Sequence, residues 1–289
     1  MDTVHCNQIL KNGKKCSRKA LKDDKCKQHL EDQEYSFNGK CITITFGDNA
    51  ENGVGMEKIG EKDDDLGRLI TPEHLQKLAD KYQGEIIDLR LRTKYIPDDL
   101  SRDDFPEASV LILRDWCRNP DELFQELMEE TWDQKALFRG EVKNKNARHN
   151  LCFSDRSSEA NYSKGKGTVL DFEDLPELSK NRKRVAKLLP FKTTIFGEGN
   201  LYYDVTSTYI GLHGDTERSF VLGLRLGDPI PLYFKWFYQT EGLGKAKIIE
   251  LNHGDLYIMS FFATGNNWKK RNIPTLRHAA GYPGLIKKL

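Results

Sequence analysis

Hydrophobic and polar residues alternate in short runs along the last third of the chain. Turn-forming residues separate several of these runs, at positions 227–229, 242–244 and 253–255. The runs occupy residues 199–203, 209–215, 219–226, 231–238, 246–251, 256–260 and 274–279. Closely spaced short strands joined by turns are typical of an antiparallel double-sheet jelly roll.

The preceding part of the chain mixes strand-like and helix-like patterns. Residues 41–46, 85–89 and 108–113 have the composition of strands. A helix is predicted from Thr71 to about Gly84, because Pro72 suits the first turn of a helix. Two more helices are predicted at residues 121–130 and 175–189. We therefore expect an α+β protein with a double-stranded β-helix (jelly-roll) core and flanking helices.

Length and composition suit one large domain with small additions. With 289 residues, of which 38% are hydrophobic, the chain can bury a single large core. We expect residues 108–289 to form the jelly-roll domain. Residues 31–107 should form an extension of strand, loop and helix that packs on this core, and residues 1–30 should form a separate small module.

No stretch approaches the roughly 18 apolar residues of a membrane span, and the first residues lack the pattern of a secretory signal. We therefore expect an intracellular protein, of the cytoplasm or the nucleus, with no membrane partner. In such a compartment its six cysteines should be free thiols or metal ligands.

Metal-ligating residue types are evenly spaced through the first thirty residues. They follow the pattern C-x9-C-x9-C-x2-H and are Cys6, Cys16, Cys26 and His29. Three thiolates and an imidazole suit a tetrahedral, structural Zn2+ ion, although the loops are longer than in most zinc fingers. The alternative is four unlinked residues in a basic tail.

The same segment carries eight basic residues between positions 11 and 27. These side chains would suit a phosphate backbone or an acidic partner, or they would simply form the solvated surface of the module. The cysteine pattern resembles short terminal fingers in proteins of large DNA viruses and some protists. A virus-encoded protein is therefore one interpretation.

The sequence His213-Gly214-Asp215 ends one of the predicted C-terminal strands. Side chains alternate along a strand, so His213 and Asp215 point the same way and can hold one cation together. With a further histidine they would form the 2-His-1-carboxylate triad of non-haem Fe(II) oxygenases, which leaves positions open for a co-substrate and O2. Alone the pair is a weak signal, because a polar pair on a solvated strand has the same pattern.

His278 is the best candidate for the third ligand. A late strand of a jelly roll returns beside an early one, and His278 lies in the last predicted strand. His253 precedes a Gly-Asp turn, which it would cap instead, and His149 lies in a segment with the pattern of a lid.

Residues 147–155 concentrate arginine, histidine, asparagine and an aromatic side chain. We expect a surface loop or lid here, in which Arg148, His149 and Asn150 bind the substrate. The alternative is an ordinary loop-to-strand junction with Leu151 and Phe153 buried.

Taken together, these motifs resemble the AlkB-like branch of the Fe(II)/2-oxoglutarate dioxygenases over roughly residues 108–289. The matching segments are Ala147-Arg148-His149-Asn150 with Ser154-Asp155, Asn200-Leu201-Tyr202, His213-Gly214-Asp215, Leu224-Arg225-Leu226-Gly227, His253-Gly254-Asp255-Leu256-Tyr257-Ile258-Met259-Ser260, and Trp268. The resemblance implies that His213, Asp215 and His278 bind Fe(II). It also implies that Asn200 and Tyr202 hydrogen-bond 2-oxoglutarate, with O2 as the second co-substrate.

One departure from the family pattern concerns the third ligand. The family has a histidine two residues after the tryptophan, where this chain has Lys270. If Lys270 took the ligand position, the iron site would be incomplete. Residues 275–279 have a more strand-like sequence than residues 269–271, which favours His278.

A second departure concerns the co-substrate. The family closes with arginines that pair with the carboxylates of 2-oxoglutarate, and no arginine follows His278. Arg225 is the first candidate to replace them, because an arginine inside an apolar strand needs a buried partner. Lys287 and Lys288 are the fallback, whereas Arg277 should face away from the iron because it neighbours His278.

The reaction implied by the resemblance is hydroxylation of a C–H bond, coupled to conversion of 2-oxoglutarate to succinate and CO2. On an N-methyl group the product loses formaldehyde, which amounts to demethylation. A methylated base in DNA or RNA is the favoured substrate, although a net charge of only +1 lacks the basic excess of a strong nucleic-acid binder. The alternatives are a protein hydroxylase or demethylase, with the zinc module binding the partner, and a catalytically inactive binding scaffold.

Overall fold

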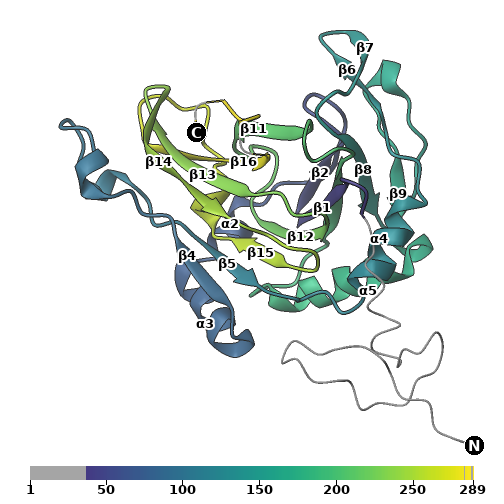
Figure 1. Cartoon of the computed structure of the whole chain (residues 1–289), viewed down its shortest axis with the longest axis horizontal. Coiled ribbons are helices and arrows are strands. Elements are labelled where there is room, and N and C mark those ends of the chain that lie inside the picture. The colour runs from purple at the N-terminus through teal and green to yellow at the C-terminus, as the bar shows by residue number, and fades with distance from the viewer. Residues whose placement is uncertain (1–36, 283, 288) are drawn as a thin grey trace, which may run out of the picture. The chain divides into compact units, whose positions relative to one another are not determined.

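A computed structural model describes residues 37–282, 284–287 and 289 of the chain. The predicted zinc ligands Cys6, Cys16, Cys26 and His29 lie outside the described residues, and so does Lys288. Residues from Asn38 onward form one compact unit. It is a mixed α+β unit built mostly of β-sheet, with few helices (Figure 1).

The secondary structure elements follow the chain in this order. The strands are β1 (Cys41–Gly47), β2 (Asn49–Glu51), β3 (Lys58–Gly60), β4 (Glu85–Asp88), β5 (Ser109–Leu113), β6 (Lys135–Phe138), β7 (Glu141–Asn144), β8 (His149–Ser154), β9 (Val169–Asp171), β10 (Phe196–Tyr202), β11 (Tyr209–His213), β12 (Val221–Gly227), β13 (Leu232–Tyr238), β14 (Glu241–Ile249), β15 (Leu256–Met259) and β16 (Thr275–Gly281). The α-helices are α2 (Asp64–Arg68), α3 (Pro72–Tyr82), α4 (Pro120–Met128) and α5 (Pro176–Val185).

Two sheets make up most of the unit. The large sheet has eight strands in the order β4-β5-β15-β12-β1-β10-β8-β9, and all its pairings are antiparallel except that of β8 with β9. The small sheet has four antiparallel strands in the order β11-β16-β13-β14. Strands far apart in the sequence therefore lie side by side in both sheets.

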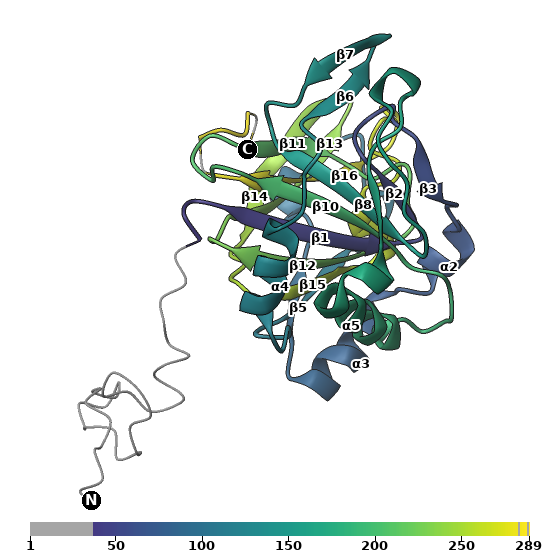
Figure 2. The same cartoon turned by 90° about the vertical axis from the view of Figure 1, so that its right-hand side faces the viewer.

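The core lies between the two sheets. Its buried members include Val110, Ile112, Val221 and Met259 from the large sheet, and Phe234, Trp236, Leu276 and Ala280 from the small sheet. Helices α3, α4 and α5 lie on the other side of the large sheet (Figures 1 and 2), where α3 contacts β4 and β5, and α4 contacts β12. None of the helices in the described part of the chain is long and apolar enough to cross a membrane.

Helix α3 forms where the sequence predicted a helix. The hydroxyl of Thr71 accepts a hydrogen bond from the backbone N–H of His74, and Pro72 occupies the first turn. Leu75, Leu78 and Ala79 form its buried stripe. The helix ends at Tyr82 and is capped by Gln83, whose φ of 55° lies in the left-handed region.

Strand β1 is an integral part of the large sheet, where it pairs with β10 on one side and β12 on the other. The expectation that residues 31–107 form an extension packed on the core is therefore corrected, since β1 and β4 both belong to the large sheet. All seven residues of β1 are buried. The strand is covered on both faces, and its sequence carries no sign of which strands it pairs with.

Two shorter segments also differ from the prediction. Residues 147–155, expected to form a loop or lid, contain β8, in which Leu151 and Phe153 are fully buried, as in the alternative interpretation. Residues 242–244 were predicted to form a turn but belong to β14. The turn lies just before them, where Gln239 and Thr240 have φ values of 49° and 77°. Two successive residues with positive φ suit a two-residue hairpin turn. Glutamine and threonine are not the residue types that predict such a turn from sequence.

The register of the large sheet brings polar side chains together on its inner face. Asn200, Thr43 and Arg225 are neighbours across three strands. The next row along contains Glu198, Thr45, Gly223 and Tyr257. Cross-strand neighbours share a face of the sheet, so each row presents its side chains to the space between the sheets.

Gly223 makes room for the ring of Tyr257. A Cβ atom at Gly223 would lie 2.0 Å from Cζ of Tyr257, which is far inside a van der Waals contact. Any larger residue at this position would push the tyrosine ring away from the sheet.

We predict that Gly223→Ala lowers the free energy of unfolding by about 1–3 kcal/mol, because over-packing a filled site forces side chains out of place. Gly211→Ala is the matched control, since nothing lies within 4 Å of its Cβ position, and its change should stay below about 1 kcal/mol. Urea unfolding followed by tyrosine and tryptophan fluorescence measures both. Equal changes in the two variants would contradict the packing described for Tyr257.

Candidate metal centre

The pairing of β11 with β16 brings two histidines together. His213 is the last residue of β11, and it lies directly opposite His278 of β16 in the antiparallel register. Asp215 follows two residues later and is 7% exposed. Because side chains two residues apart point the same way in extended chain, the carboxylate of Asp215 reaches the two imidazoles.

The three side chains form a compact donor group. Nε2 of His213 and Nε2 of His278 each lie 3.6 Å from Oδ1 of Asp215. One donor atom from each of the three residues lies within 4.8 Å of the others. Metal bonds of about 2.0–2.2 Å to nitrogen or oxygen allow donor atoms on one ion to be up to roughly 4 Å apart. Both 3.6 Å separations from Asp215 fall within this limit, so the carboxylate can share one cation with each histidine.

The protonation of the group also suits a cation. Nδ1 of His213 lies 2.8 Å from the carbonyl oxygen of Gly211. A carbonyl can only accept, so Nδ1 carries the proton of this bond and Nε2 keeps its lone pair. Burial and the nearby His278 lower the pKa of His213 to about 4, so that its ring is neutral at pH 7. Burial alone would raise the pKa of Asp215, but His278 beside it holds that pKa well below its usual value.

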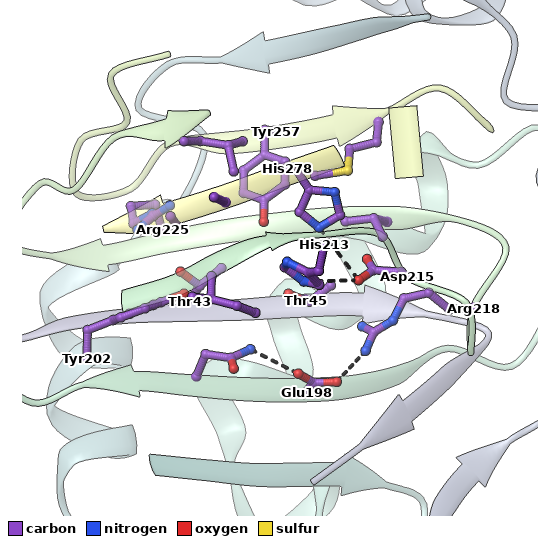
Figure 3. Close-up of a pocket in the computed structure, with 17 residues that line it drawn as sticks. Thr43, Thr45, Glu198, Tyr202, His213, Asp215, Arg218, Arg225, Tyr257 and His278 are labelled. Atoms are coloured by element: carbon purple, nitrogen blue, oxygen red, sulfur yellow. Dashed lines mark hydrogen bonds and ion pairs between the residues drawn. The ribbon is translucent and has the colours of Figure 1, made fainter. Parts of the chain in front are cut away.

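The group lines a cavity of about 50 Å³ between the sheets (Figure 3). Arg225 and Tyr202 lie toward one end of this cavity, and Glu198 and Arg218 lie toward the other. Apolar side chains complete the wall, namely Ile210, Val221, Leu232, Met259, Ala279 and Ala280. Arg225, His278 and Asp215 are buried side chains of this wall, and burial strengthens their interactions with anything bound there.

Arg225 is fully buried and lacks an anionic partner among the described residues. Its Nη1 donates to Sγ of Cys41 at 3.3 Å, which is a weak acceptor. Its Nε and Nη2 have no hydrogen-bond partner, and neither does the buried hydroxyl of Thr43 in the same cross-strand row. A buried charge without a counter-charge costs several kcal/mol. This end of the cavity is therefore suited to an anion.

Asn200 and Tyr202 both line the cavity. Oδ1 of Asn200 accepts hydrogen bonds from Nε of Arg148 and, at 2.8 Å, from Nδ2 of Asn150. Its Nδ2 donates to Glu198 at 3.1 Å. Asn200 is thus fixed from both sides before any ligand binds.

The residues predicted to contact substrate make contacts within the protein, and their contact with a substrate stays a prediction. Arg148 and Asn150 hold Asn200 in place, and the side chain of Asn150 is buried within the sheet. His149 stacks on Tyr203 with ring centroids 4.4 Å apart. None of the three residues lines the cavity, because β8 is a buried strand beyond β10 rather than a lid.

The other candidates for ligands lie away from the donor group. Lys270 is exposed in a turn, whereas His278 faces His213, so the structure brings His278 to the triad. His253 accepts a hydrogen bond from the backbone N–H of Gly227 at 2.8 Å, so it holds the end of β12 and not the Gly254-Asp255 turn that it was predicted to cap. Lys287 is exposed, and Arg277 packs over the ring of Phe237 at 4.0 Å.

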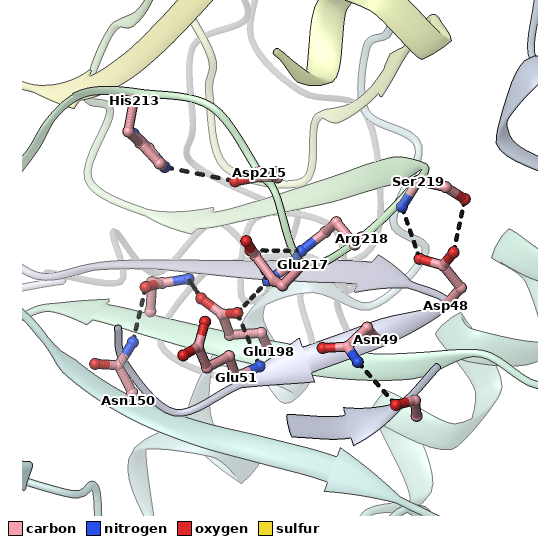
Figure 4. A network of polar contacts seen from close by, with 12 residues as sticks. Asp48, Asn49, Glu51, Asn150, Glu198, His213, Asp215, Glu217, Arg218 and Ser219 are labelled. Carbon is pink, nitrogen blue, oxygen red and sulfur yellow. Dashed lines mark hydrogen bonds and ion pairs between the residues drawn. The ribbon is translucent and has the colours of Figure 1, made fainter. Parts of the chain in front are cut away.

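Sequence reasoning missed a buried ionic cluster beside the donor group (Figure 4). Arg218 is 2% exposed, and it is bonded to Glu198 and lies 3.2 Å from a carboxylate oxygen of Glu217. Burial, with the charge of Asp215, raises the pKa of Glu217 to about 7. Strand alternation predicts that the side chains of Glu198 and Asn200, two residues apart, point the same way. No local sequence pattern indicates that Glu198 pairs with Arg218.

Comparison with known proteins identifies a viral relative of the chain. No family model matches the chain. The chain is 38% identical over 250 residues to "Uncharacterized protein R156" of Acanthamoeba polyphaga mimivirus, and the alignment covers 85% of this chain and 97% of that protein. Identity at this level over nearly the whole of the viral protein shows common descent. The chain therefore belongs to the same protein family as the mimivirus protein R156.

Proposed function

We propose that this protein is an Fe(II)- and 2-oxoglutarate-dependent dioxygenase, and that its two facing sheets form a double-stranded β-helix core of the AlkB-like type. The proposal rests on two features that occur together in one cavity. A His-Asp-His donor group and a buried arginine without a counter-charge both line it. A metal-chelating dicarboxylate would satisfy both features together.

The donor set suits Fe(II). Two imidazoles and one carboxylate on one side of an ion form the facial triad of non-haem iron oxygenases, with the opposite positions open. His213, Asp215 and His278 would be the three ligands. When bound, the iron with 2-oxoglutarate and O2 supplies the oxidising chemistry that hydroxylates a C–H bond and yields succinate and CO2.

The rest of the cavity suits 2-oxoglutarate. Arg225 offers two nitrogens without partners, in the forked geometry that pairs with a carboxylate. The hydroxyl of Thr43 stands beside it in the same row, and Tyr202 lies on the wall nearby. These side chains would bind and orient the far carboxylate, while Asn200 would contribute its remaining N–H. The fixed hydrogen bonds of Asn200 mean that little side-chain freedom is lost on binding.

For the substrate, the resemblance to AlkB-like proteins favours a methylated base in nucleic acid, with a protein side chain as the alternative. The proposed N-terminal zinc site, formed by Cys6, Cys16, Cys26 and His29, would then serve as a structural module that contacts the partner. The viral relative supports the proposal that the chain is virus-encoded. Against an inactive scaffold stands the buried Arg225, whose charge has no structural counter-charge among the described residues.

The triad is tested by titrating the metal-free protein anaerobically with Fe(II) and 2-oxoglutarate. We expect the weak visible charge-transfer band of a chelated 2-oxoglutarate complex, and we expect His278→Ala to abolish it because one ligand is lost. Lys270→Ala is the matched control and should keep the band, since Lys270 is exposed and lies outside the donor group. A wild-type protein without the band would refute the oxygenase proposal and leave the binding scaffold.

The role of Arg225 is tested by comparing two co-substrates. We expect Arg225→Met to weaken 2-oxoglutarate binding by roughly 100-fold, because the ion pair of a buried arginine is lost. Binding of 2-oxobutanoate, which lacks the far carboxylate, should change little. Isothermal titration calorimetry on the Mn(II)-loaded protein gives both affinities.

Arg225→Lys keeps the positive charge but loses the two adjacent N–H donors of the guanidinium. Its affinity for 2-oxoglutarate should therefore lie between those of wild type and Arg225→Met. If Arg225→Met weakened both co-substrates alike, the arginine would be supporting the fold and not the far carboxylate.

A further inference from the structure

The cavity contains a second buried arginine, on the side opposite Arg225. Figure 3 shows Arg218 beside Asp215 and Glu198, whereas Arg225 lies beyond Thr43 on the other side of the donor group. Both arginines line the same cavity, and both are buried, at 2% and 0% exposure. The sequence interval between them gave no indication that they share a site.

Arg218 is held firmly but is not fully bonded. Its Nη2 bonds to Glu198, and its Nε lies 3.2 Å from Oε1 of Glu217, to which it donates. Its Nη1 is buried and has no hydrogen-bond partner in the described part of the chain. A buried donor of this kind costs free energy unless something in the cavity accepts its hydrogen bond.

The charges around Arg218 decide what that acceptor can be. Glu198 and Glu217 both contact the guanidinium, and Asp215 and Glu51 add further carboxylates nearby. Arg218 therefore has its counter-charge already, unlike Arg225. Another anion at Nη1 would be repelled by the surrounding carboxylates, whereas a neutral oxygen would accept the hydrogen bond without adding charge.

The cluster also fixes the direction of the free donor. Glu198 accepts from Arg218 through one oxygen and from Asn200 through the other. Its Oε2 also accepts the backbone N–H of Glu51 at 3.3 Å. A guanidinium gripped at Nε and Nη2 cannot rotate without breaking these bonds, so Nη1 is oriented before a ligand arrives.

We propose that Nη1 of Arg218 donates to a neutral carbonyl oxygen, of the amide type, on the substrate to be oxidised. Arg218 is then a specificity-determining residue that holds this carbonyl beside the His213-Asp215-His278 group. The inference rests on the proposed function, in which 2-oxoglutarate takes the Arg225 end and leaves the Arg218 end to the substrate. It adds the chemical class of the group that the second end accepts.

The test uses the full chain loaded with Zn(II), which is redox-silent, and with 2-oxoglutarate. Arginine side chains are labelled with 15N, and the guanidinium signals of Arg218 and Arg225 are assigned from Arg218→Lys and Arg225→Lys. Three probes are then titrated separately: N-methylacetamide as a neutral carbonyl, acetate as an anion and tetramethylammonium as a cation. We expect N-methylacetamide to shift the Arg218 signals, and acetate and tetramethylammonium to leave them unchanged.

The variants supply the second readout. Arg218→Lys keeps the charge between Glu198 and Glu217 but loses the separate Nη1 donor, so N-methylacetamide should bind roughly tenfold more weakly. Arg277→Lys is the matched control, because Arg277 also has an unpartnered Nε but packs over Phe237 outside the cavity. Its affinity for N-methylacetamide should equal that of wild type. Thermal unfolding of both variants checks that the fold is retained.

The outcomes separate this inference from the proposed function. If 2-oxoglutarate fails to shift the Arg225 signals, the proposed function fails. If Arg225 responds to 2-oxoglutarate but Arg218 does not respond to N-methylacetamide, only the present inference fails. A stronger response of Arg218 to acetate than to N-methylacetamide would also overturn it, because the surrounding carboxylates would then not exclude an anion. A stronger response to tetramethylammonium would overturn it as well, because this end of the cavity would then take a cation and not a neutral acceptor.

Discussion

The hydrogen bonding of β1 to both β10 and β12 is the constraint on which the rest of the structure depends. On one side of β1 the sheet continues through β12, β15, β5 and β4, and on the other through β10, β8 and β9. Without β1, the strand that carries Arg225 and the strand that carries Asn200 would have no common partner. Thr43 and Thr45 of β1 form the middle of the cavity wall between them. One strand thus sets the spacing of the arginine and the asparagine along the cavity wall.

The cavity shows how a fold can give two arginines different tasks. A guanidinium carries the same charge wherever it stands, so its preference is set by what the surrounding chain supplies. Among the described residues, Arg225 bonds to a thiol and lies near two tyrosines, whereas Arg218 contacts two carboxylates. An anion can therefore pair with Arg225, whereas the carboxylates around Arg218 repel one, although both arginines lie in a single cavity. The donor group lies between them and contributes its own carboxylate to the Arg218 side.

Local patterns in the sequence predicted much of this structure, because they depend on residues close together in the chain. The pairing of His213 with Asp215 follows from strand alternation, and α3 follows from its cap and apolar stripe. His278 came from topological reasoning about which strand returns beside β11, and the register opposite His213 bears that reasoning out. In contrast, the place of β1 and the burial of β8 depend on partners more than forty residues away along the chain. The Glu198–Arg218 pair is non-local in the same way, and periodicity cannot reveal it.

The small sheet ends in a long edge strand, and its sequence limits what that edge can do. Strand β14 has β13 on one side only and extends over nine residues. An unpaired edge of this length is a template for pairing with another chain. Lys245 and Lys247 are exposed on β14, and the register with β13 is irregular between Phe234 and Trp236. Charge and irregular geometry both discourage a second copy from adding a strand there, so the β14 edge of the sheet that carries His213 and His278 is protected from edge-to-edge association.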